Sequence, residues 1–386
     1  MRRQRERVGF MRQALMVAGA LGLLAGVAGA DVTTERSASI VVFPKVITTS
    51  TRDTIIQLTN TNNSMVHAHC YYINGALADP NSPQIPGIND PVWNELDFDI
   101  WLTKQQPTVW VASTGREADP TDNSTSCADS NGSCYGVGLD PGFVPPTAED
   151  FTGELRCIEV DATGQPVGGD HLKGEATLVN TDTGDVAKYN GIGILHNSGV
   201  EIDTDNVLCL GDSGPDICPS GAEYNACPDI WILNHFADGA ADPIADDESP
   251  EVNNVGTELT IVPCTEDLEN KKAASVVIQF SVTNEFETSF SASTTVTCWE
   301  NADLADINEQ AFGRVALTTD FAQTRIRAVG TGGVLMVAEE FHQVQINTSD
   351  DIHTASAAFN PHIEDNPDSA RSDTITFQPD LVVPEP

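Results

Sequence analysis

Short runs in which apolar and polar residues alternate cover most of the chain, and apolar residues at helical spacing are nearly absent. Alternation with a period of two is typical of strands that bury one face. These runs are rich in Val, Ile and Thr, which favour strands, and Gly-, Asp- and Asn-rich turns separate them. The pattern therefore predicts an all-β protein.

The predicted strands fall into two series on either side of an acidic, cysteine-bearing segment. Each series has about seven short strands, as an immunoglobulin-like β-sandwich does. We therefore predict two such sandwiches. The first series is Ser39–Val46, Thr54–Asn60, Met65–Ile73, Phe98–Thr103, Thr108–Ala112, Gly153–Val160 and Gly174–Val179. The second is Glu258–Val262, Ala274–Thr283, Ser289–Trp299, Arg314–Thr319, Thr324–Val329, Val334–Phe341 and Thr374–Phe377.

Composition shifts along the chain predict the domain boundaries. The first sandwich is expected over residues 31–205, with a long Asp-, Ser-, Gly- and Pro-rich loop at 117–146, and the second over residues 257–386. Residues 206–256 are expected to form an acidic connector that contains cysteines. Within it, charge repulsion along Asp238–Glu251, together with Pro243 and Pro250, favours a stiff, solvated linker.

A weak internal similarity suggests that the two sandwiches arose by duplication. The run Ile56–Leu58 is followed by Cys70 and an aromatic residue, and the run Ile278–Phe280 is followed by Cys298 and an aromatic residue. Both stretches read as a strand, a turn and a second strand, although their spacings differ.

The N-terminus has the features of a secretory signal peptide. Five arginines lie within the first twelve residues, and an uncharged run from Ala14 to Ala30 ends in small residues. This run is short and weakly apolar for a membrane anchor, so we predict residues 1–30 to be a cleaved signal. No other run approaches membrane length. The mature chain is therefore expected to be secreted or at the cell surface, in a bacterial setting, without a membrane span.

The net charge excludes several classes of partner. The chain has 57 Asp and Glu against 19 Lys and Arg, which gives a formal charge of −38. Removal of the predicted signal, with five Arg and one Glu, deepens the charge to −42. Such a surface repels nucleic acids and anionic lipid, so neither is an expected partner.

The nine cysteines are expected to form disulfides, because the chain is predicted to be exported and contains no Cys-x-x-Cys pair. An odd number leaves at least one thiol unpaired within the chain. Sequence proximity favours Cys127 with Cys134, two of Cys209, Cys218 and Cys227, and Cys264 with Cys298, and Cys70 is expected to be a buried thiol.

Three short motifs are similar to those of the trypsin-like serine proteases. They are Ala68-His69-Cys70, Asp99-Ile100-Trp101-Leu102 and Gly211-Asp212-Ser213-Gly214-Pro215, and they occur in the family's order. The resemblance implies that Ser213 is the nucleophile, His69 the general base and Asp99 the carboxylate that orients it. It also implies that the amides of Gly211 and Ser213 form the oxyanion hole.

The sequence also departs from that family. The nucleophile motif lacks its second glycine, the residue expected at the floor of the specificity pocket is Val207, and a long stretch of chain follows Ser213. A turn inside a loop from Cys209 to Cys218 explains the same residues without catalysis. We therefore predict no catalytic residues and keep His69, Asp99 and Ser213 as the alternative.

Two kinds of metal site remain alternatives. His67 and His69 are two apart on a predicted strand and so share a face, but no third ligand is apparent. Oxygen-rich loops at 182–185 and 203–206 could supply ligands for Ca²⁺, although Asp and Gly are also ordinary turn residues. We predict no cofactor, with calcium as the possible exception.

Taken together, these features favour a secreted or cell-surface structural or adhesive β-sandwich protein without catalytic activity. The alternatives are a trypsin-like protease and a calcium- or metal-dependent extracellular binding module. Partners or self-association are expected through exposed edge strands, such as the predicted strand Ser39–Val46.

Overall fold

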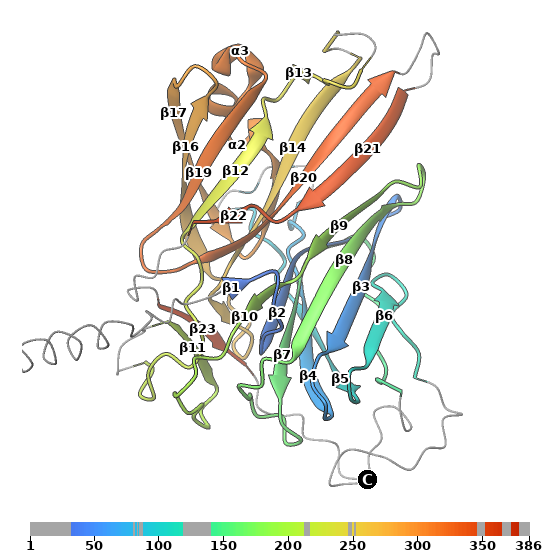
Figure 1. Cartoon of the computed structure of the whole chain (residues 1–386), viewed down its shortest axis with the longest axis vertical. Coiled ribbons are helices and arrows are strands. Elements are labelled where there is room, and N and C mark those ends of the chain that lie inside the picture. The colour runs from blue at the N-terminus through green and yellow to red at the C-terminus, as the bar shows by residue number, and fades with distance from the viewer. Residues whose placement is uncertain are drawn as a thin grey trace, which may run out of the picture. The chain divides into compact units, whose positions relative to one another are not determined.

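The computed structural model describes residues 32–79, 82, 84, 88–118, 140–211, 217–245, 249–250, 252–345, 352–364 and 372–377. Strands make up 56% of the structure and helices 4%, so the all-β prediction is confirmed. Residues 31–386 form one compact unit (Figure 1). The predicted signal peptide lies outside the described residues, as does most of the predicted loop 117–146.

The first half of the chain builds two sheets that pack face to face. One has six strands in the order β1 (Val32–Thr33), β10 (Ile192–Ile194), β2 (Ile40–Thr48), β7 (Phe151–Val160), β4 (Val66–Asn74) and β5 (Glu95–Leu102). The other has four, in the order β6 (Pro107–Val111), β3 (Arg52–Asn60), β8 (Leu172–Asn180) and β9 (Val186–Asn190). Apolar side chains from both sheets, including Phe43, Ile56 and Leu155, form one buried cluster between them.

The second half builds two more sheets. One has the order β17 (Ser289–Thr297), β16 (Ser275–Asn284), β19 (Phe321–Val329), β12 (Ile230–Phe236) and β22 (His362–Ile363). The other has the order β13 (Ala240–Ala241), β14 (Asn254–Pro263), β20 (Val334–Gln345) and β21 (Ile352–Phe359), and β18 (Glu300–Asp303) also pairs with β14. Two short helices, α2 (Leu304–Phe312) and α3 (Arg314–Leu317), follow β18.

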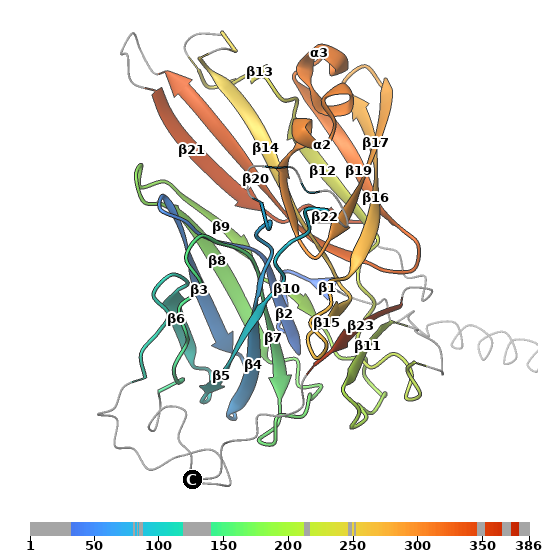
Figure 2. The same ribbon diagram turned by 180° about the vertical axis from the view of Figure 1, so that it is seen from behind.

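A fifth, three-stranded sheet joins distant parts of the sequence. In it β23 (Ser372–Thr376) lies between β11 (Val207–Gly211) and β15 (Glu266–Asp267), antiparallel to the first and parallel to the second (Figures 1 and 2). Leu208 is paired with Ile375, so residues far apart in sequence close this sheet.

The predicted arrangement as two immunoglobulin-like sandwiches is therefore wrong. Five sheets correspond in number to a five-bladed β-propeller rather than to two sandwiches, although they range from three to six strands and do not repeat one four-stranded blade. Residues 206–256, the predicted connector, supply β11, β12 and β13, which belong to three different sheets. The domain boundaries themselves stay predictions.

Buried contacts tie the two halves of the chain together. The Trp299 Nε1 donates a hydrogen bond to the Pro44 carbonyl (2.7 Å), and a Cβ at Gly75 would lie 2.5 Å from the Trp299 Cβ. Only glycine at position 75 leaves room for this indole. One hydrophobic cluster accordingly includes Ile73 from the first half and Leu259 from the second.

A buried ion-pair network joins the same halves. Lys45 on β2 is fully buried, and its ammonium contacts Glu258 on β14 and Glu339 on β20, the latter at 2.7 Å. Arg52 on β3 also contacts Glu339, at 2.6 Å. Because each buried charge has an opposite charge beside it, the network avoids the large cost of an unpaired buried ion.

The cysteine predictions are confirmed in part. Cys209 pairs with Cys218, one of the combinations expected from proximity. The predicted pair Cys264–Cys298 is wrong, and so is the expectation of a free thiol at position 70. The structure instead has disulfides Cys70–Cys157 and Cys227–Cys264, and Cys298 is a buried free thiol. The predicted pair Cys127–Cys134 lies outside the described residues.

Strand pairing explains these corrections, because Cys70 and Cys157 face each other across neighbouring strands that are far apart in sequence.

Two strand predictions also fail. The predicted edge strand Ser39–Val46 lies inside its sheet as β2, between β10 and β7, and Arg314–Thr319 contains helix α3.

The three disulfides of the described residues fit an oxidising compartment outside the cytoplasm. Within the described ranges, no helix is long and apolar enough to cross a membrane.

The duplication hypothesis is not supported by the strand order. The first pair of similar segments becomes β3 and β4, which belong to different sheets. The second pair becomes β16 and β17, which are neighbours in one antiparallel hairpin. The same local pattern therefore serves two different topologies.

Candidate functional site

Two histidines share one buried carboxylate at an end of the six-stranded sheet. The register of β4 and β5 places His69 opposite Asp99 and His67 two positions further along, opposite Trp101. Asp99 Oδ1 lies 2.6 Å from His67 Nε2 and 3.1 Å from His69 Nδ1. All three polar side chains are buried, so the two imidazoles replace water as partners of the carboxylate.

Both ring nitrogens of His67 have polar partners. Its Nδ1 lies 2.8 Å from the Asp161 carbonyl oxygen, which can only accept a hydrogen bond, and its Nε2 faces the Asp99 carboxylate. The imidazole also stacks on Trp101 with centroids 3.8 Å apart. These three contacts fix the orientation of the ring.

The pKa of Asp99 reflects its burial and these contacts. Burial on its own would raise the pKa, but the hydrogen bonds from His67 and His69 outweigh it, and the pKa is lowered. Asp99 is therefore ionised at neutral pH.

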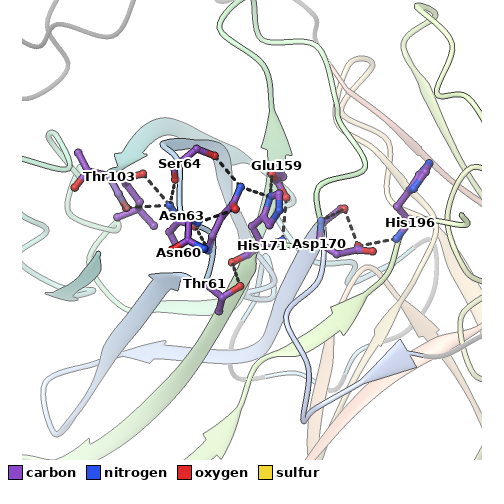
Figure 3. Close-up of polar contacts among 12 residues, drawn as sticks. Asn60, Thr61, Asn63, Ser64, Thr103, Glu159, Asp170, His171 and His196 are labelled. Carbon is purple, nitrogen blue, oxygen red and sulfur yellow. Dashed lines mark hydrogen bonds and ion pairs between the residues drawn. The ribbon is translucent and has the colours of Figure 1, made fainter. Parts of the chain in front are cut away.

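A second histidine–carboxylate pair lies next to the first. The buried Glu159 accepts from the backbone N–H of His171 at Oε2 (3.1 Å) and contacts the His171 Nδ1 at Oε1 (2.7 Å), as Figure 3 shows. Burial raises the pKa of Glu159, and the His171 contacts offset this only in part. The pair thus fixes the orientation of a half-exposed imidazole.

A pocket of about 480 Å³ brings the two pairs together. Its walls include His67, Trp101, Glu159 and His171. A Cβ at Gly169 would lie 2.0 Å from Glu159 Oε1, so the backbone can pass this close to the carboxylate only as glycine. Within each pair, the histidine and the carboxylate are hydrogen-bonded to each other. The pocket is therefore lined by polar groups that already have partners.

One contact of the predicted protease triad is present in the structure. His69 and Asp99 do come together, as the resemblance implies for base and orienting carboxylate. The other His69 nitrogen, Nε2, lies 3.7 Å from Asp97 Oδ2, and the Gly211 amide already donates to the Tyr224 carbonyl at 3.0 Å. That amide is therefore occupied and unavailable to an oxyanion. Ser213 lies outside the described residues, so the triad stays a prediction.

In the described part of the chain, neither predicted metal site has a set of ligands gathered around one point. There, three candidate ligand atoms meet within 4.8 Å only at Cys227, Cys264 and Asp373. The two sulfurs are joined in a disulfide and offer no thiolate, and Asp373 accepts hydrogen bonds from Gly333 N and Thr265 Oγ1. This group therefore does not fit a metal ion.

The histidine nitrogens and the oxygen-rich loops are engaged in local hydrogen bonds. His67 and His69 both direct a nitrogen at Asp99. In the second loop, Asp203 Oδ1 accepts from Asp205 N (3.0 Å), and Asp205 Oδ1 accepts from Val207 N (2.8 Å). These are the side-chain-to-backbone bonds that Asp makes in turns. Calcium binding stays a prediction.

The free side of β17 is a second candidate site, and its backbone directions follow from two hydrogen bonds. Cys298 N donates to Ala274 O, and Asn284 N donates to Thr288 O. In an antiparallel pair, alternate residues direct N–H and C=O toward the neighbouring strand. The unbroken register from Ser275↔Thr297 to Thr283↔Ser289 therefore directs the even-numbered residues of β17 to β16. The odd-numbered residues direct theirs outward.

These outward backbone groups form an open edge. β17 ends its sheet, as Figures 1 and 2 show, and within the described ranges no backbone hydrogen bond is made to Ser289, Ser291, Ser293 or Thr295. The strand contains no charge and no proline, the features by which proteins usually protect an edge. From Ser289 to Thr295 it is thus a template for pairing.

The surface beside this edge is unusual for so acidic a chain. The outward side chains of β17, β16 and β19 form a face on which no carboxylate occurs, and we call it the β17 face. It carries hydroxyls and amides on β17 and β16 and two arginines on β19. Its members are Ser289, Ser291, Ser293, Thr295, Ser275, Val277, Gln279, Ser281, Thr283, Phe321, Gln323, Arg325, Arg327 and Val329.

Comparisons with known proteins assign no family. No protein-family profile matches the chain, and no curated protein matches it. One solved structure, described as “Crystal Structure of Thermotoga maritima 1070”, aligns with 36% of this chain and 97% of its own, at 9% identity and a TM-score of 0.23. A likeness of this size carries no argument about fold or function.

The sequence predicted only part of these two sites. The contact of His69 with Asp99 was implied by the motifs, but the Glu159–His171 pair has no motif and depends on how the loop after β7 returns to its own strand. The signal for the open edge is the charge-free run of Ser and Thr from Ser289 to Thr297, which identifies a strand but not its place in a sheet.

Proposed function

We propose that this protein is an exported structural or adhesive protein that binds partners by strand addition at the β17 edge, without catalysis. The observation that carries this proposal is the uncharged edge from Ser289 to Thr295, where the outward amides and carbonyls have no hydrogen bond within the described ranges. At the end of the strand, the Thr297 carbonyl accepts from Gln84 Nε2 and from Trp299 N. The three disulfides and the basic, apolar N-terminal sequence support export.

Strand addition uses the backbone for affinity and the side chains for selection. An incoming strand would bond to the outward N–H and C=O groups of Ser289, Ser291, Ser293 and Thr295. Its side chains would lie beside the hydroxyls and amides of the β17 face. Partners without a strong negative charge are favoured, because most of the remaining surface is acidic.

A peptide-binding experiment tests this proposal. An uncharged, fluorescently labelled peptide of alternating Thr, Val and Ser should bind the full chain, and hydrogen exchange should slow at the amides of Ser291 and Ser293. Ser291→Pro removes one outward N–H without touching the ladder to β16, so it should lower affinity at least about tenfold. Ser291→Thr keeps the amide and should bind as the wild type does.

The exchange pattern makes the test specific to this edge. The even-numbered amides, such as that of Ala292, are already bonded to β16 and should not change. Binding that is equally strong in the Ser291→Pro protein, or protection confined to another strand, would contradict the proposal. Far-UV circular dichroism of each variant checks that the sheet is intact.

A further inference from the structure

We infer that the strand received by the β17 edge is β17 of a second copy of this chain, paired antiparallel about a twofold axis. The inference rests on the proposed strand addition and names its partner. It would join two five-stranded sheets into one continuous sheet of ten strands across an isologous interface.

The backbone of β17 is complementary to itself in this arrangement. With the axis at Ala292, Ser291 lies opposite the partner's Ser293, and Ser289 lies opposite the partner's Thr295. All four are outward-directed residues, so each pair exchanges two backbone hydrogen bonds. The uninterrupted register of β17 with β16 leaves the strand without a bulge that would twist the edge away.

The side chains also match their symmetry mates. Hydroxyls lie opposite hydroxyls on the outward face, and no like charges meet, because β17 contains none. On the opposite face Phe290, which is half-buried in one copy, would lie across from the partner's Thr294 and lose further contact with water.

Charge decides where two copies can approach. Each chain carries −38 formally, so most pairs of surfaces repel. The outward side chains of the β17 face carry only the charges of Arg325 and Arg327 on β19, and Arg325 contacts Glu364 at 2.7 Å. Two exposed carboxylates, Glu285 and Glu287, lie in the turn that precedes β17. This is therefore a surface on which a second acidic chain meets no row of carboxylates.

Three other edges of the described structure, those of β5, β9 and β11, suit a second copy less well. β5 presents Glu95, Asp97 and Asp99 along its length. The β9 edge is closed in part by Asn360, whose amide donates to the Asn190 carbonyl (3.0 Å). The β11 edge is covered by bonds to Tyr224. β17 combines length, neutrality and open backbone groups.

Sedimentation velocity of the full chain, from micromolar to millimolar concentration, tests the inference. We expect a concentration-dependent dimer that Ser291→Pro shifts to monomer at least about tenfold in dissociation constant, while Ser291→Thr leaves it unchanged. The register is tested by mixing Ser291→Cys and Ser293→Cys chains with a short bismaleimide. These should cross-link to each other, and a Gln279→Cys chain on the same face should not.

The outcomes separate this inference from the proposal beneath it. A chain that stays monomeric at every concentration but binds the uncharged strand peptide at β17 overturns the second copy and keeps strand addition. A chain that neither dimerises nor binds the peptide overturns both. A dimer that Ser291→Pro does not weaken uses another surface and also overturns the inference.

Discussion

Asp99 is a single carboxylate that holds two imidazoles, and the stability of this corner depends on its charge. Its oxygen is bonded to both His67 and His69, and all three side chains are buried. Replacing the carboxylate with an amide removes the charged acceptor that both imidazoles contact, in a place that water does not reach. Loss of one partner from such a buried pair is among the costlier single changes in a protein.

We expect Asp99→Asn to lower the free energy of unfolding by about 3 kcal/mol at neutral pH. The lowered pKa of Asp99 gives the pH dependence. Its stabilisation is fully present above the ordinary Asp pKa and is lost as pH falls through the folded value, so wild type and variant should converge in acid. Urea unfolding across a pH series measures this.

Asp97→Asn is the matched control for that experiment. The Asp97 side chain is 49% exposed, and its contact with His69 Nε2 is long at 3.7 Å. Solvent screens such a pair, so the variant should change stability by less than about 0.5 kcal/mol. If both variants lowered stability equally, the shared, buried carboxylate of Asp99 would contribute no more than an exposed one.

At the scale of the elements, the disulfides restrain very different lengths of chain. Cys70–Cys157 closes a loop of 87 residues between neighbouring strands, whereas Cys209–Cys218 closes one of 9. A crosslink removes more conformational freedom from the unfolded chain when its loop is longer.

We therefore expect the double variant Cys70→Ala/Cys157→Ala to lose about 2 kcal/mol more stability than Cys209→Ala/Cys218→Ala, from loop length alone. Urea unfolding of the two variants under non-reducing conditions measures the difference. Single alanine variants of Cys70 and Cys209 control for the loss of packing at each site. Equal costs for the two double variants would mean that loop entropy does not govern their effect.

The alternating pattern located most strands because each buries one face. β16 illustrates this, with Val276, Ile278, Phe280 and Val282 buried and the residues between them outside. The pattern could not reveal β12, a short apolar run within the acidic segment, because a run of seven residues lacks a clear period. The sheets, the disulfides and the Glu159–His171 contact depend on which distant strands pair. No local sequence pattern indicates that pairing.

For the whole molecule, the dominant long-range force is repulsion among carboxylates. The compact unit of residues 31–386 carries a formal charge of −42, and folding brings these charges closer together. The buried pairs around Lys45 oppose this only locally. Added salt should therefore act mainly on the repulsion.

We expect the melting temperature to rise by several degrees when NaCl is raised from about 10 mM to 0.5 M, because the screening length falls well below the size of the molecule. Calorimetry at neutral pH measures the rise. At about pH 4, where many carboxylates are protonated, the same change in salt should have a smaller effect. A melting temperature that falls with salt would show that attractive ion pairs dominate.

The three-stranded sheet also determines when the fold can close. β23 bonds to β11 and to β15, partners that precede it by more than a hundred residues. A chain that emerges from its N-terminus onward has both partner strands available long before residues 372–376 arrive. Such distant contacts make folding slow. The topology thus delays completion of this sheet until β23 is present, so the edges of β11 and β15 stay open during most of chain synthesis.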